Sequence, residues 1–182
     1  MPRIIYSVNI TINGCCDHRH VVADEEHHRY ATQLIQSADA LLLGRNTFDL
    51  FEAYWPGAFG NTELPEAVRD LASLLNSVRK YVATNKPLNT TWNNCAPIRG
   101  SMDQAIPELR KTTNGTVVMF GSPSLAANLA KIDEIDEFHF LIQPVAIDDN
   151  PRLLTGLTVK KDLRLLDSRA FKSGVLLTKY GR

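Results

Sequence analysis

The sequence lacks a surplus of charge of either sign and any long apolar run. Lys plus Arg and Asp plus Glu number 20 each among 182 residues, so the formal net charge is zero. Binding to nucleic acid or to an anionic membrane surface generally requires a basic surplus, so neither partner is expected. No stretch reaches the roughly 18 apolar residues of a membrane-spanning helix, and the short run at 4–8 is not a signal peptide. Near-zero charge also offers little resistance to self-association.

Cysteine is scarce, with only Cys15, Cys16 and Cys95 present. Their odd number and the adjacent pair argue against a disulfide framework, so the cytoplasm is the expected compartment. The adjacent cysteines lie near His18 and His20, which are also metal-ligand types. This spacing matches no standard zinc site, so we expect a solvated loop at the edge of a crevice and no metal.

Two fingerprints of nucleotide-binding proteins are also missing. The chain contains neither a Gly-x-Gly-x-x-Gly turn nor a Gly-Lys-Ser/Thr loop, which argues against an ordinary Rossmann site and against an NTPase site.

Apolar runs and helical stripes instead alternate along the chain as far as residue 132, and only strands are expected beyond it. Strands are expected at 4–12, 41–43, 81–84, 96–98, 116–120 and 137–145, and a hairpin joins 163–168 to 175–180. Helices are expected at 24–37, from about 47, at 64–75, and from capping residues 101 and 122, with an aromatic loop at 54–60. The pattern predicts a single α/β domain over 1–182, with a mostly parallel sheet flanked by helices and an antiparallel C-terminal hairpin.

The most informative stretch is 38–51, where an apolar strand runs into Gly44-Arg45-Asn46-Thr47 and a helix. Asn46 or Thr47 is expected to cap that helix and leave backbone N–H groups pointing outward at its positive end. The Arg45 guanidinium would add a planar fork of donors, so the turn predicts a grip on a phosphorylated ligand. An ordinary strand–helix turn with a solvated Arg45 remains the alternative.

A second turn of this kind follows the strand at 116–120, at Gly121-Ser122-Pro123-Ser124. The carboxyl ends of parallel strands share one edge of a sheet, so two helix N-termini there can converge on one anion such as a pyrophosphate. A third strand ends in Thr84-Asn85-Lys86, whose polar groups could hold a ribose phosphate or an adenine edge.

Over nearly its whole length the chain resembles the dihydrofolate reductase-like reductases, including the C-terminal reductase domain of the bifunctional riboflavin-biosynthesis deaminase–reductase. The resemblance rests on segments 13–14, 43–48, 83–85, 120–125 and 140–144, taken in this order. It implies NADPH as cofactor and a homodimer formed through the C-terminal strands. The residues implied to contact NADPH are Asn13 and Gly14 at the nicotinamide, Gly44, Arg45, Thr47, Thr84 and Asn85 at the phosphates, and Gly121, Ser122 and Ser124 at the second pyrophosphate turn.

The second turn departs from the Gly-Gly that is common in this family. Because Ser122 has a Cβ, we expect its φ to be negative, with Gly121 carrying any positive φ and the Ser122 hydroxyl capping the helix that Pro123 begins.

The implied reaction is NADPH-dependent reduction of a pyrimidine or pteridine heterocycle, similar to that of 5-amino-6-(5-phosphoribosylamino)uracil reductase. Dihydrofolate reductases carry a carboxylate on the first helix, but the nearest match here is a histidine. The proton would therefore come from water, Glu25, Glu26 or His28. Tyr54 and Trp55 would either stack on the heterocycle or seal the core or a dimer contact. Dihydrofolate reduction and non-catalytic nucleotide binding are the alternatives.

Overall fold

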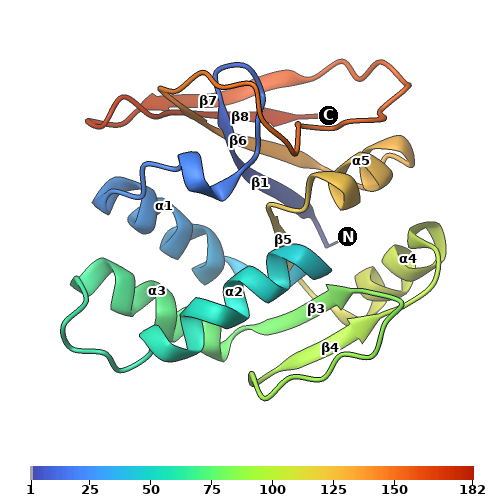
Figure 1. The fold of residues 1–182 in the computed structure, drawn as a ribbon. Coiled ribbons are helices and arrows are strands. Elements are labelled where there is room, and N and C mark those ends of the chain that lie inside the picture. Colours follow the sequence, from blue (N-terminus) through green and yellow to red (C-terminus); the bar gives the residue numbers. More distant parts are fainter. Residues whose placement is uncertain (1) are drawn as a thin grey trace.

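The computed structural model describes residues 2–182, and its centre is one eight-stranded sheet of order β4-β3-β2-β5-β1-β6-β8-β7 (Figure 1). The strands are β1 (Ile4–Thr11), β2 (Ala38–Gly44), β3 (Arg79–Ala83), β4 (Cys95–Ile98), β5 (Thr116–Phe120), β6 (Glu137–Gln143), β7 (Arg164–Ala170) and β8 (Leu176–Gly181). Neighbours from β4 through β6 pair in parallel, whereas β8 pairs antiparallel with both β6 and β7. The predicted mostly parallel α/β sheet with an antiparallel C-terminal hairpin is therefore confirmed.

Helices cover both faces of this sheet, which explains why its central strands are continuous apolar runs. The α-helices are α1 (Glu25–Gln36), α2 (Arg45–Ala58), α3 (Glu66–Ser77), α4 (Met102–Thr112) and α5 (Pro123–Lys131). One core lies between the sheet and α4 and α5, and the other between the sheet and α1, α2 and α3. Alternate residues of β1 serve the two cores: Tyr6 and Val8 pack into the first and Ile5 into the second. None of the helices within residues 2–182 is long and apolar enough to cross a membrane.

The expected aromatic loop at 54–60 is wrong, because α2 continues to Ala58. Phe48, Phe51 and Trp55 recur at helical spacing and pack into the second core, which holds this segment in a helix. Pro56 lies in the last turn, where its missing N–H removes one i→i−4 hydrogen bond, and the helix ends two residues later.

Two expected helix caps also differ from the structure. Gly44, rather than Asn46 or Thr47, is the N-cap of α2, so both of those residues lie inside the first turn. Ser101 does precede α4, but its hydroxyl makes no capping hydrogen bond; its carbonyl accepts the backbone N–H of Gln104 instead.

Candidate functional site

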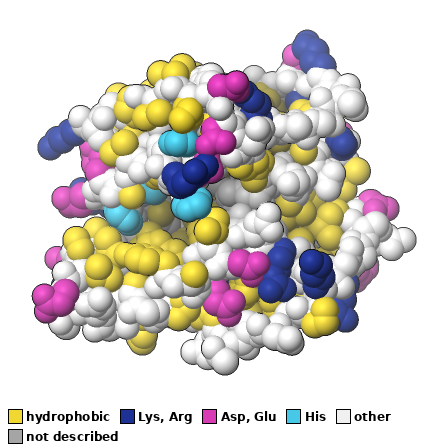
Figure 2. Space-filling model, in the orientation of Figure 1, with side chains coloured by type: hydrophobic (Ala, Val, Ile, Leu, Met, Phe, Trp, Pro, Cys, Tyr) yellow, Lys and Arg dark blue, Asp and Glu magenta, His cyan; other side chains and the backbone are white. Residues whose placement is uncertain are grey.

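A cleft of about 880 Å³ opens where the parallel strands end. Its floor includes residues 7–9 of β1, Gly44 of β2, Ala83 of β3 and Phe120 of β5, and its walls come from α1, α2 and α5. Figure 2 shows the hollow from outside, with histidine and charged side chains gathered along part of its rim. Open α/β sheets bind their ligands at this edge.

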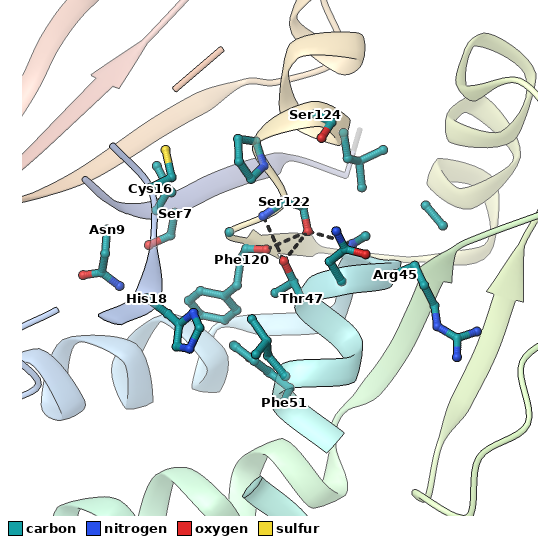
Figure 3. Close-up of a pocket in the computed structure, with 18 of the residues that line it drawn as sticks. Ser7, Asn9, Cys16, His18, Arg45, Thr47, Phe51, Phe120, Ser122 and Ser124 are labelled. Carbon is teal, nitrogen blue, oxygen red and sulfur yellow. Dashed lines mark hydrogen bonds between the residues drawn. The ribbon is translucent and has the colours of Figure 1, made fainter. Parts of the chain in front are cut away.

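The two glycine-containing turns meet at the base of this cleft through hydrogen bonds between β2–α2 and β5–α5 (Figure 3). The backbone N–H of Gly44 donates to Ser122 Oγ at 2.8 Å. Ser122 in turn donates to Thr47 Oγ1 twice, from its backbone N–H at 3.0 Å and from its hydroxyl at 2.8 Å. These bonds link residues 75 or more positions apart, so they fix the two helix starts relative to one another.

The backbone at this junction is left-handed at two consecutive residues, with φ of +54° at Gly121 and +53° at Ser122. The expectation of a negative φ at Ser122 is therefore wrong, as is the expectation that its hydroxyl caps α5. A left-handed non-glycine residue costs roughly 1–2 kcal/mol, and the hydrogen bonds to Thr47 and from Gly44 offset that cost. The peptide bond between Gly121 and Ser122 is trans.

Both helices that begin here point their N-termini into the cleft. The first backbone N–H groups of a helix have no acceptor within it and carry the positive end of its dipole. Asn46 of α2 and Ser124 of α5 line the cleft in these first turns. The tight approach between Gly44 and Ser122 keeps the two turns close, so the arrangement fits a diphosphate group.

Arg45 lies at the cleft on the far side of Thr47, and its guanidinium points away from Ser122 (Figure 3). Its Nε donates to Asp49 Oδ1 at 2.7 Å and its Nη1 to the carbonyl of Pro87 at 3.2 Å. The side chain remains 35% exposed, so it is accessible to a ligand. Arg45 is thus held by two hydrogen bonds at the edge of the cleft, and its contact with a phosphate stays a prediction.

Thr84 and Asn85 line the cleft as well, next to the turn that precedes α4. Asn85 Oδ1 accepts the backbone N–H of Gly100 at 3.3 Å, which holds this side chain at the rim. The structure thus brings the predicted phosphate-turn residues to one cleft: Gly44, Arg45, Thr47, Thr84, Asn85, Gly121, Ser122 and Ser124.

Of the residues predicted to contact the nicotinamide or the heterocycle, only Trp55 lines the cleft. Asn13 and Gly14 do not line the cleft; Asn13 exchanges hydrogen bonds with the backbone of Ile147 instead. Of the aromatic pair, Trp55 lines the cleft, whereas Tyr54 is 49% exposed outside it.

The three expected proton donors also lie outside the cleft lining. Glu25 forms an ion pair with Arg29 on the solvent side of α1, and Glu26 accepts from Arg169 and from the backbone of residue 172. His28 Nδ1 lies 2.7 Å from the carbonyl oxygen of Asp24. Their role stays a prediction that this arrangement does not favour.

Polar cleft residues that sequence reasoning did not assign to the site include Ser7 and Asn9 of β1 and His27 and Tyr30 of α1. Asn9 Oδ1 accepts from Gln143 Nε2 at 2.9 Å, which turns the Asn9 amide group toward the cleft (Figure 3). The sequence pattern could have identified the two β1 residues, since Ser7 and Asn9 alternate with apolar residues along a buried strand and so share one face of the sheet.

Burial keeps two titratable side chains on the cleft, His27 and Cys16, in their uncharged forms. Burial lowers the pKa of His27 to about 4, so this imidazole is neutral at physiological pH. Burial raises the pKa of the Cys16 thiol to about 12, so this thiol is protonated at neutral pH. Asp17 is charged instead, because hydrogen bonds from Arg19 hold its pKa well below the usual range.

Comparison with known proteins identifies chains of similar sequence and fold. The chain is 25% identical over 181 residues to the uncharacterized protein YyaP of Bacillus subtilis (strain 168), covering 98% of this chain and 94% of that one. A solved structure assigned to riboflavin biosynthesis in Shewanella sp. PV-4 superposes with a TM-score of 0.74 at 19% identity, covering 99% and 98% of the two chains.

A solved diaminohydroxyphosphoribosylaminopyrimidine deaminase/5-amino-6-(5-phosphoribosylamino)uracil reductase from Thermotoga maritima superposes with a TM-score of 0.68 at 12% identity. That similarity covers 99% of this chain and 56% of the longer one. These structures confirm the dihydrofolate reductase-like fold. The sequence model of the RibD C-terminal domain matches residues 2–177, and the chain therefore belongs to the RibD C-terminal domain family.

Proposed function

We propose that this protein is an NADPH-dependent reductase of a small pyrimidine or pteridine heterocycle, similar to 5-amino-6-(5-phosphoribosylamino)uracil reductase. The observation that carries the proposal is the junction of Gly44, Thr47 and Ser122, which sets two helix N-termini side by side at the cleft. We further propose that residues 1–182 act as one domain in the cytoplasm, which the three free cysteines support.

When bound, NADPH would supply a hydride to an electrophilic carbon of the heterocycle. The backbone N–H groups of the first turns of α2 and α5, together with the Ser124 hydroxyl, would hold its pyrophosphate. Gly44 and Gly121, whose own N–H groups are donated to Ser122 and Ser7, would give it room to approach, and Arg45 would hold the 2′-phosphate. The chain's remaining task is to orient the heterocycle and to exclude water. Trp55 and Asn9 suit that task because they offer an aromatic surface and amide N–H donors on the cleft.

A pyrimidine is favoured over dihydrofolate because no carboxylate of α1 lines the cleft. Asp17 is the one acidic side chain that lines it in the part of the chain described, and Arg19 pairs with that carboxylate at 2.7 Å. A direct test is to follow NADPH oxidation with the riboflavin-pathway pyrimidine, a dihydropterin and dihydrofolate. Turnover of the pyrimidine alone is the expected result. Tight NADPH binding without turnover of any of the three would leave a non-catalytic nucleotide-binding protein.

Arg45→Ala is expected to weaken NADPH binding about ten-fold or more, because a hydrogen bond to a charged group is worth about 1.5–3 kcal/mol. NADH lacks the 2′-phosphate, so its affinity should hardly change. Asp49→Asn is the matched variant and should strengthen NADPH binding, since it frees the Arg45 guanidinium from a competing carboxylate. Fluorescence titration measures all four affinities, and equal affinity of the native protein for NADPH and NADH would contradict the assignment.

We also propose a homodimer formed through β7 and β8. Every residue of β7 is exposed, and the pairing register puts Leu165 and Leu176 on one face, 54% and 39% exposed. Such apolar surface on an edge hairpin favours burial against a second copy. Leu165→Glu combined with Leu176→Glu should convert a dimer to a monomer in light scattering, while Phe59→Glu at the end of α2 should not. A monomer mass for the native protein at micromolar concentration would refute the proposal.

A further inference from the structure

Four polar side chains are joined by hydrogen bonds in a continuous row, which runs from the cleft to the first residue of β6. Ser7 Oγ lies 3.0 Å from the Tyr30 hydroxyl, which lies 2.9 Å from His139 Nδ1. His139 Nε2 then lies 3.2 Å from a carboxylate oxygen of Glu137. Ser7 and His139 are paired neighbours on parallel strands β1 and β6, and Tyr30 reaches both of them from α1.

The two ends of this row have different surroundings. Ser7 and Tyr30 line the cleft, whereas Glu137 lies at the other end and also pairs with Arg3, whose side chain is 59% exposed. Between them His139 is only 4% exposed. The row therefore joins a largely buried part of the cleft to a group that exchanges protons readily with solvent.

The intermediate groups are suited to passing a proton. Burial raises the pKa of Tyr30 well above its usual value, so its hydroxyl stays protonated and can donate and accept at once. Burial lowers the pKa of His139, while the hydrogen bond to Glu137 opposes that shift. Histidine is the side chain whose charge changes most readily near neutral pH.

We propose that Glu137, His139, Tyr30 and Ser7 form a proton relay that protonates the substrate in the cleft. This inference rests on the proposed reductase function. As a hydride reaches the electrophilic carbon, the neighbouring heteroatom takes the Ser7 hydroxyl proton. Ser7 is reprotonated by Tyr30, and Tyr30 by the Nδ1–H of the His139 imidazolium, which leaves a neutral imidazole with its proton on Nε2. Rotation of the ring turns the bare nitrogen toward Glu137, from which it regains a proton supplied by solvent. One proton is consumed for each hydride, and every relay group returns to its starting state.

The pH dependence follows from the charges that face His139. Glu137 on its own strand stabilises the imidazolium, whereas Lys179 of β8 and Arg3 before β1 disfavour it. Lys179 is itself paired with Asp167 at 2.9 Å. Since the relay starts from the imidazolium, the rate should be full below the pKa of His139 and fall as pH rises through it. That kinetic pKa should equal the one obtained from nuclear magnetic resonance titration of the His139 ring.

Tyr30→Phe tests the relay because it removes the hydroxyl that joins His139 to Ser7. General acid catalysis contributes roughly 10²–10⁴-fold, and water in the cleft can replace part of it, so we expect about a ten-fold loss of kcat. NADPH affinity should not change. The solvent deuterium isotope effect should rise, and the His139 limb of the pH profile should disappear.

Tyr6→Phe is the matched control, since Tyr6 lies on β1 next to Ser7 but faces the opposite core. Its hydroxyl is buried and has no hydrogen-bond partner within residues 2–182, so this variant should keep the native rate and pH profile. If Tyr30→Phe matches Tyr6→Phe in rate, isotope effect and pH profile, the relay is refuted while the reductase function stands. If the native protein binds NADPH but reduces none of the three heterocycles, both proposals fall.

Discussion

Replacing Gly44 with alanine is expected to weaken NADPH binding by roughly ten- to hundred-fold, because overpacking of a tight contact costs about 1–3 kcal/mol. A Cβ on Gly44 would lie 2.9 Å from Ser122 Oγ and 3.0 Å from Ser122 Cβ. Both are closer than side chains normally approach, so the turn before α5 would have to move away. The backbone at Gly44 has a φ of −73°, which alanine adopts freely. The effect would therefore come from the contact between the two turns and not from local backbone strain.

Gly57→Ala provides the matched control for this substitution. Gly57 lies in the same helix, α2, and a Cβ there would meet no atom within 4 Å. Alanine should raise the stability of the helix by about 0.5–1 kcal/mol and leave NADPH binding unchanged. Calorimetric titration of the two variants, with circular dichroism to establish folding, measures the difference. Native affinity in Gly44→Ala would show that the junction of the two turns does not hold the cofactor.

The general position of this site could be predicted from the sequence because its cause is local. A strand covered by helices on both faces must be a continuous apolar run, and 116–120 has that form before Gly121. The chain must then turn into a helix, and Pro123 is favourable in a first turn. Parallel pairing of β2 with β5 brings the two turns to one edge of the sheet.

The conformation of Ser122 could not be predicted in the same way. Local rules favour a negative φ for any residue with a Cβ, and they gave the wrong answer. The opposing cause is a set of hydrogen bonds to Thr47 and Gly44, 75 and 78 positions away in the chain. Nothing near residue 122 in the sequence reports on those partners.

The cleft-facing residues of α1 could be predicted from the sequence only in part. Tyr30, Ala31 and Leu34 fall on one stripe of this helix by their spacing; the structure buries Ala31 and Leu34, and Tyr30 and Ala31 line the cleft. Extending the stripe back by one turn reaches His27, which lines the cleft, and not Glu25 or His28. Chemical type alone selected the expected donors, whereas helical periodicity would have selected the residue that faces the ligand.

Thr47→Val is expected to reduce NADPH affinity by a similar factor, roughly ten- to hundred-fold, through loss of hydrogen bonds and not through a clash. Valine has nearly the shape of threonine but cannot accept from the Ser122 backbone N–H or hydroxyl. A buried donor left without a partner costs about 1–3 kcal/mol, and for a chain of this size each kcal/mol lowers Tm by about 2–4 °C. Thr47→Ser keeps the hydroxyl and should retain most of the affinity and stability.

A double-mutant cycle distinguishes this explanation from a general weakening of α2. Ser122→Ala removes the hydroxyl that donates to Thr47 and accepts from Gly44, but it keeps the backbone N–H. Because Thr47→Val and Ser122→Ala remove one shared hydrogen bond, their costs should not add, and the double variant should lose less affinity than the sum of the single losses. Strictly additive losses would mean that the two side chains act independently, and that the two helix starts are not held together through Thr47 and Ser122.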